Sequence, residues 1–155
     1  YLQASALKQL QEVFESMNEL NPLELSLFIF LNNSVKSFTV IILGIIFGIV
    51  PMIFLVLYGF TIGLVAFEVI RDKGVLFMMA GILPHGIIEI PSFLISTAIG
   101  LRIGYKTIKR IKSEESIKRE IKTGIKFFIL RILPLFFIAA IVEVFVTPFF
   151  ILLFS

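Results

Sequence analysis

One histidine and two glutamates are the side chains of this chain that could carry chemistry inside an apolar environment. His85 and Glu89 lie between two prolines in residues 81–91, within an otherwise apolar run over residues 75–101. Residues four apart project from one face of a helix, so we expect both side chains to point the same way. Glu143 lies well inside the last apolar run. Ionisable groups at bilayer depth are costly and usually face a protein interior or a polar cavity, so we predict that the three meet there.

Three kinds of site fit this set of residues. Imidazole nitrogen and carboxylate oxygen are zinc ligands, so His85, Glu89 and Glu143 are candidate ligands of a Zn²⁺ ion. One histidine is a weaker signature than the two-histidine helix motif of metalloproteases. Acids and histidines inside a membrane also form proton or ion paths. Alternatively, the three residues form a hydrogen-bonded cluster that fixes how the helices pack. The residue pattern leaves all three interpretations open.

The composition is that of an integral membrane protein. Hydrophobic residues make up 58% of the 155 residues and charged residues 16%, whereas soluble domains carry roughly 25% charged residues and no long apolar runs. The chain has no cysteine, which excludes disulfides and thiolate metal sites. It also shows no Ser-His-Asp order, no phosphate loop and no nucleotide fingerprint. The sequence therefore favours a membrane protein that is not an enzyme.

The apolar runs predict an all-helical membrane bundle with about four spans. Residues 37–67 are uncharged and would extend about 46 Å as one helix, although a hydrocarbon core of about 30 Å needs only about 20 residues. A break at residues 48–51 divides this stretch. The spans are then expected at about residues 27–49, 52–70, 75–101 and 127–154. Pro84 and Pro91 break the third, which is either a kinked span or a re-entrant hairpin of two half-helices.

Residues 1–22 are predicted to form a peripheral amphipathic helix ahead of a membrane domain over residues 23–155. Apolar side chains recur in it at spacings of three and four residues. Asn21-Pro22 would end it, because the residue before a proline avoids the helical region. The helix packs on the membrane face, on a partner, or on the protein's own loops. Asn32 and Asn33 fall in the first turns of the next span, where they cap it or point into the bundle.

Residues 102–126 form a basic amphipathic segment with nine Lys or Arg and three Glu. Positive charge beside membrane spans marks the cytoplasmic side, so we place this loop in the cytoplasm. There it sets the orientation of the protein and contacts anionic lipid, and nucleic acid is not an expected partner. Two short helices are expected to meet at Ser113, where a serine cap is followed by two acids.

Three pairs of glycines stand one helical turn apart. They are Gly44 and Gly48, Gly59 and Gly63, and Gly100 and Gly104. Lipid offers no hydrophobic drive for helix association, and small residues at this spacing let helix backbones approach closely. The pairs predict tight packing inside the bundle or in a homodimer.

Several of these elements together resemble the stage II sporulation protein M family. Pro84-His85-Gly86-x-x-Glu89 is the most specific, and Asn32-Asn33, Tyr58-Gly59 with Gly63, and Glu143-x-x-x-Thr147-Pro148 accompany it. The family leads us to expect asparagine where this chain has Tyr58. The resemblance implies a small multi-pass helical protein without enzymatic activity, whose namesake anchors or scaffolds peptidoglycan hydrolases during engulfment. The site residues that it carries over are Asn32, Asn33, His85, Gly86, Glu89 and Glu143.

The function predicted from these residues and this resemblance is that of a scaffold or assembly protein in the cell membrane. We expect a homodimer, with a partner protein of the membrane or cell envelope and a candidate zinc site at the His/Glu cluster. A transporter or channel-like component is the first alternative, because a broken helix with a midplane site is expected there. An intramembrane metallo-hydrolase with Glu89 or Glu143 as its base is the second.

Overall fold

The structure of the chain is a computed structural model, which describes residues 20–110 and 117–154. Every regular element in these residues is a helix. The elements are α2 (Pro22–Leu43), α3 (Ile49–Lys73), α4 (Val75–Arg110), α5 (Ile117–Phe127), the π-helical turn η1 (Phe128–Ile132), α6 (Leu133–Ile141), the π-helical turn η2 (Val142–Val146) and α7 (Thr147–Leu152). The last five form one continuous rod, so the described residues contain four helices long and apolar enough to cross a membrane. This confirms the predicted all-helical bundle of about four spans.

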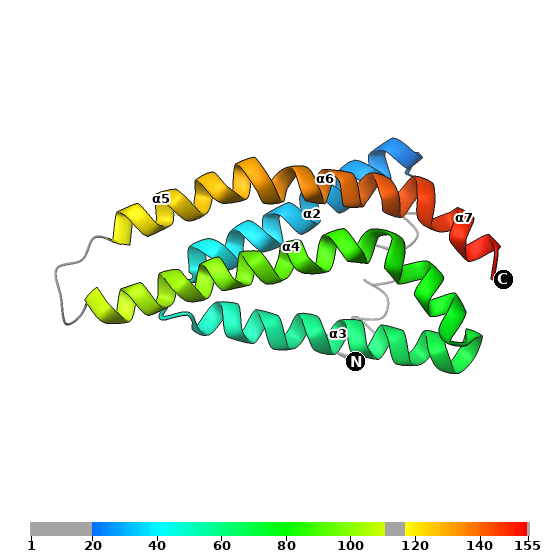
Figure 1. Cartoon of the computed structure of the whole chain (residues 1–155), viewed down its shortest axis with the longest axis horizontal. Coiled ribbons are helices and arrows are strands. Elements are labelled where there is room, and N and C mark those ends of the chain that lie inside the picture. Colours follow the sequence, from blue (N-terminus) through cyan, green and yellow to red (C-terminus); the bar gives the residue numbers. More distant parts are fainter. Residues whose placement is uncertain (1–19, 111–116, 155) are drawn as a thin grey trace, which may run out of the picture.

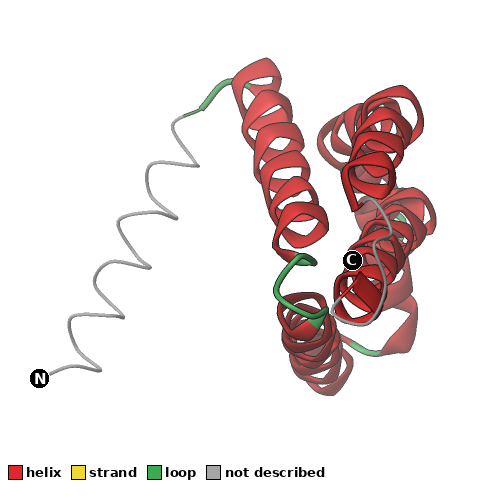
Figure 2. Ribbon diagram, turned by 90° about the vertical axis from the view of Figure 1, so that its left-hand side faces the viewer, coloured by secondary structure: helices red, strands yellow, loops and turns green. Residues whose placement is uncertain are grey.

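The four rods run up and down along one long axis. Figure 1 shows α2 and α4 running in one direction and α3 and the α5–α7 rod in the other, and the view along the axis shows them side by side (Figure 2). The α2–α3 turn and the facing ends of α4 and α5 lie at one end of the bundle. The turn at Gly74 and the end of α7 lie at the other end. α4 contacts every other rod, so it positions the rest.

The first span begins at Pro22, earlier than the expected start at about residue 27. Asn21 caps it: its Oδ1 accepts hydrogen bonds from the backbone N–H groups of Leu23 (3.0 Å) and Glu24 (2.9 Å). The Glu24 carboxylate accepts one from the Asn21 N–H (3.0 Å), which completes a capping box. Asn21-Pro22 therefore starts a helix. The amphipathic helix predicted before it falls largely on residues 1–19, outside the described residues.

The turn between α2 and α3 packs against the backbone of α4. A Cβ atom built on Gly100 would lie 2.6 Å from the carbonyl oxygen of Val40, and one on Gly104 would meet the backbone of Gly48 more closely still. Gly48 also has a φ angle of 73°, a conformation that glycine adopts without strain. Gly44 contacts Gly100 in the same way. Two of the three glycine pairs thus pack inside the bundle, and the helix break falls at residues 44–48.

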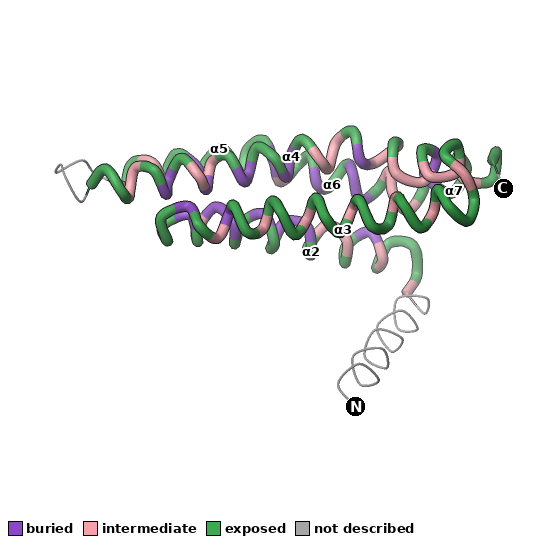
Figure 3. Tube along the Cα trace, turned by 90° about the horizontal axis from the view of Figure 1, so that it is seen from below, coloured by how far each residue is buried: buried purple, intermediate pink, exposed green. Residues whose placement is uncertain are grey.

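The third pair faces outward from α3. Among the described residues, no atom outside its own helix turn would lie within 4 Å of a Cβ atom on Gly59 or Gly63. In an apolar stretch of 18 residues, only 6% of the residues of α3 are buried, against 33% for α2. Figure 3 shows α3 largely in the exposed colour. This helix packs on its neighbours through a narrow stripe and leaves the rest of its surface for lipid or another protein.

α4 is one continuous helix through both of its prolines. It bends in its N-terminal part (Figure 1). Residues 75–101 therefore form a kinked span and not a re-entrant hairpin. The helix continues to Arg110, and α5 continues directly into η1. The two short helices predicted for residues 102–126 are therefore the ends of two long ones, since only residues 111–116 separate them. Ser113 lies outside the described residues.

The prolines of the last rod each follow a π-helical turn. Proline has no N–H group and removes one hydrogen bond of the helix. In η1 the N–H of Leu133 donates to the carbonyl of Phe128, and in η2 that of Thr147 donates to Val142, in each case five residues back. The wider turns keep the rod continuous past Pro134 and Pro148. A π turn holds one extra residue, which rotates the following side chains by about 100° around the helix.

Replacement of Gly104 by alanine is expected to destabilise the bundle by about 1–3 kcal/mol, because the new methyl group would overlap the Gly48 backbone. Gly81→Ala on the same helix is the matched control, since its methyl group would lie 4.0 Å from the Ile151 side chain, an ordinary contact, and alanine favours a helix over glycine by up to about 1 kcal/mol. Unfolding of the purified protein in detergent, followed by circular dichroism, measures both variants. Equal effects of the two substitutions would contradict the packing described for α4.

Candidate metal centre

The three ionisable residues predicted to meet do come together in the structure. His85 and Glu89 lie one helical turn apart on α4, between Pro84 and Pro91, and Glu143 lies in η2 of the last rod. One ligand atom from each residue lies within 4.8 Å of the others, and all three side chains are half-buried. Nitrogen and oxygen donors from two separate rods thus converge on one point inside the apolar part of the bundle.

Thr147 fixes the orientation of the imidazole. Its Oγ1 lies 3.3 Å from Nδ1 of His85 and donates to the carbonyl oxygen of Val142 at 3.2 Å. A hydroxyl has one hydrogen to donate, so with that hydrogen on the Val142 carbonyl it accepts from His85 in the tautomer that carries its proton on Nδ1. This arrangement leaves the Nε2 lone pair for another ligand. Histidines that bind metals are usually held in this way, with the second ring nitrogen hydrogen-bonded to the protein.

Tyr58 brings the third rod to the cluster. Its hydroxyl donates to Oε1 of Glu89 at 3.1 Å. Its ring stacks on Phe93, with centroids 4.3 Å apart, and Phe93 in turn stacks on Phe54 and packs edge-on against Phe136. Phe93 is 2% exposed. The aromatic stack therefore holds the phenol in place, and the phenol holds the Glu89 carboxylate.

A cavity of about 410 Å³ adjoins the cluster between α3, α4 and η2. The three ionisable residues, Tyr58 and Thr61 supply its polar lining, and Ile62, Val65, Ile82 and Ile90 are among its apolar lining. Gly86 also lines the cavity. A Cβ atom there would lie 3.2 Å from Ile82, so the glycine allows tight packing beside His85. The cavity leaves room for water or a small ligand next to the cluster.

Comparison with known proteins identifies the family. The family profile of stage II sporulation protein M matches residues 1–148. The chain belongs to the stage II sporulation protein M family. An uncharacterized protein of Methanocaldococcus jannaschii is 35% identical to it over 123 residues, which cover 76% of this chain and 68% of that protein. No solved structure matches the chain. Together with the four apolar rods, this membership indicates a multi-pass membrane protein.

The family resemblance also proposed two site residues that lie elsewhere. Asn32 and Asn33 sit in the middle of α2, not in its first turns, and neither lines the cavity. Asn33 is buried in the bundle and Asn32 is exposed, so the interpretation as an inward-pointing residue holds for Asn33 alone. Tyr58 and Thr147 also belong to the site, although the residue pattern did not predict them there. Two features of the sequence could have pointed to them. Tyr58 is a tyrosine inside an otherwise apolar helix, and its hydroxyl needs a partner when buried. Thr147 lies one helical turn after Glu143.

Replacement of Tyr58 by phenylalanine keeps the ring stack and removes the hydrogen bond to Glu89. We expect it to lower the free energy of unfolding by about 1 kcal/mol, the usual net contribution of one hydrogen bond. Tyr58→Leu should cost more, because it also removes the contact with Phe93. Tyr105→Phe is the control, since Tyr105 is 55% exposed and should leave stability unchanged. Thermal unfolding in detergent tests the series, and a Tyr58→Phe variant as stable as the control would contradict the role of the phenol.

Proposed function

We propose that this protein is a membrane scaffold or assembly protein whose helix packing is fixed by a divalent metal ion, zinc in particular, at His85, Glu89 and Glu143. The observation behind the proposal is the convergence of three ligand atoms within 4.8 Å. Because they come from α4 and η2, a shared ion would join two rods at membrane depth. Through Tyr58 and Glu89 it would also act on α3.

The donor set suits zinc after a small movement of the side chains. Bonds of about 2.0–2.1 Å to nitrogen and oxygen place tetrahedral ligands about 3.3 Å apart, compared with the upper limit of 4.8 Å between the atoms here. Three protein ligands leave a fourth position for water, and the adjoining cavity offers room for it. The contact between Thr147 and His85 already supplies the supporting hydrogen bond that metal-bound imidazoles need.

The charges of the cluster also favour a cation. Among the residues that line the cavity, two are carboxylates and none is Lys or Arg. Two neighbouring carboxylates at membrane depth are costly without a counter-charge. A divalent cation would neutralise both.

The scaffold role rests on family membership and on the free surface of α3. Small residues one turn apart are typical of surfaces on which membrane helices associate, and a Cβ atom on Gly59 or Gly63 would meet no other described residue within 4 Å. We place the contact of a homodimer there, with other membrane or cell-envelope partners on the remaining lipid-facing surface. We also place the basic ends of α4 and α5 in the cytoplasm, because positive charge marks that side.

A transport component is a second candidate, and the cavity supports it. A kinked helix that places polar groups beside a cavity near the middle of the membrane is the pattern of many transport sites. In that case the same three residues would bind a proton or a cation in passing and not hold a structural ion.

The metal content of the purified protein tests the metal proposal. We expect one zinc ion per chain in the wild type, and loss of most of it in His85→Ala, Glu89→Ala and Glu143→Gln, since each removes one of three ligands. Tyr58→Phe should weaken zinc affinity by about 10–100-fold, as removal of a supporting hydrogen bond does. Glu68→Gln is the control, because Glu68 pairs with Arg71 on the exposed end of α3.

Two other outcomes would contradict it. A metal-free protein that carries a proton-coupled flux in liposomes would favour transport. A metal-free protein with no flux, but with lower stability in the same variants, would indicate that the cluster only stabilises the packing of the helices.

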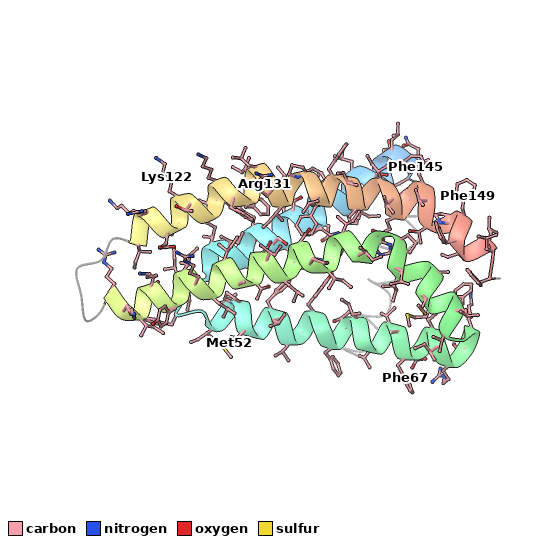
Figure 4. The ribbon with its side chains drawn as sticks, viewed as in Figure 1. Met52, Phe67, Lys122, Arg131, Phe145 and Phe149 are labelled. Carbon is pink, nitrogen blue, oxygen red and sulfur yellow. The ribbon has the colours of Figure 1, made fainter. Side chains whose placement is uncertain are left out.

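Cross-linking tests the homodimer separately, because the chain has no cysteine of its own. A Gly63→Cys variant should form a disulfide-linked dimer in membranes on mild oxidation. Phe145→Cys is the control, since Phe145 faces outward from the last rod (Figure 4) and is 41% exposed. Cross-linking of both variants to the same extent would indicate random collision, and none in Gly63→Cys would exclude α3 as the contact.

A further inference from the structure

A groove between α4 and α5 lies at the end of the bundle opposite Gly74, well away from the His/Glu cluster. Its volume is about 190 Å³. Apolar side chains line one end of it and polar side chains the other: Ile95, Ile99 and Phe127 at the apolar end, and Arg102, Glu120 and Thr123 at the polar end. The groove therefore has an apolar and a polar half.

The two halves are ordered along the direction of the span. Ile95 and Ile99 precede Arg102 on α4 by seven and three residues, which places them about 10 Å and about 4.5 Å deeper along the helix. Ile95 is 40% exposed and Phe127 is 44% exposed, so the apolar half opens onto the lipid-facing surface. A ligand that matches this order has a hydrocarbon tail toward the membrane centre and a polar group near the membrane surface.

The helix ends around the polar end of the groove are strongly basic. The described ends of the two helices, residues 102–110 and 117–126, carry eight cationic side chains and a single acid, Glu120. The cations are Arg102, Lys106, Lys109, Arg110, Lys118, Arg119, Lys122 and Lys126. Charge of this density at the edge of a span attracts anionic lipid headgroups.

Arg102 is placed to bind an anion in addition to its partner. Its Nε lies 3.0 Å from one carboxylate oxygen of Glu120 and its Nη2 lies 3.4 Å from the other. This contact uses one edge of the guanidinium group and leaves Nη1 directed away from the carboxylate, while the side chain is 69% exposed. Arg119 is one turn before Thr123 on α5 and so shares the face of a residue that lines the groove.

We propose that this groove binds an anionic phospholipid, with an acyl chain along Ile95, Ile99 and Phe127 and its phosphate at Arg102 and Arg119. The fork of an arginine matches phosphate oxygens. A neutral phospholipid would gain the acyl contacts without the charge contacts, and a soluble phosphate would leave the apolar half unfilled. The proposal does not depend on the metal centre.

Native mass spectrometry of the full chain in a neutral detergent tests this. Phosphatidylglycerol and phosphatidylcholine with identical acyl chains are added separately, and we expect the protein to retain phosphatidylglycerol preferentially. Arg119→Gln should weaken its binding about fivefold, the effect of one cationic side chain at a membrane surface. Lys122→Gln is the matched control: it removes the same charge from the same helix, but its side chain points away from α4 (Figure 4), and binding should stay within about twofold of the wild type.

A double variant, Arg102→Gln with Glu120→Gln, distinguishes the specific contribution of Arg102 from the effect of net charge. It keeps the net charge and leaves no unpaired carboxylate, and we expect the preference for phosphatidylglycerol to fall about fivefold. Unchanged binding in the double variant would overturn the assignment to Arg102. Equal retention of both lipids, equal loss in Lys122→Gln and Arg119→Gln, or equally tight binding of inorganic phosphate would each overturn the groove as a lipid site.

Discussion

The backbones of α4 and of the α2–α3 turn approach so closely at Gly100 and Gly104 that no side chain fits between them. Lipid does not push helices together as water does, so a membrane bundle depends on dispersion between closely fitted surfaces. From this contact α4 extends along the bundle to Glu89, roughly 17 Å away at 1.5 Å per residue. The position of the His/Glu cluster therefore depends on glycines that do not touch it.

Most of the polar groups inside the bundle are satisfied within their own helices. Ser92, Ser96 and Thr97 each donate to the carbonyl four residues earlier, at 2.7–3.0 Å. Ser34 and Ser37 are exceptions among the described residues, since their buried hydroxyl oxygens have no partner, and nothing in the structure explains them. The His/Glu cluster differs in kind, because its groups contact one another across helices.

One set of side chains serves both the packing and the cluster. The stack of Tyr58 on Phe93, with Phe136 edge-on to it, joins α3, α4 and α6. The same tyrosine hydroxyl holds the Glu89 carboxylate. A movement of Glu89 would therefore act on the packing of three rods.

The amino-acid sequence by itself determined the class of protein, the number of spans, the helix break near Gly48 and the common face of His85 and Glu89. These features follow from composition and from spacings of a few residues, which are local properties of the chain. The meeting of Glu143 with His85 could be expected from depth alone, but only the tertiary structure decided it. The π turns in the last rod rotate its later side chains by about 100° each, so residue spacing does not predict which face Glu143 presents. Likewise, Tyr58 and Asn33 lie in similar apolar runs, and only the packing of α3 and α2 against α4 brings the first to the cluster and leaves the second away from it.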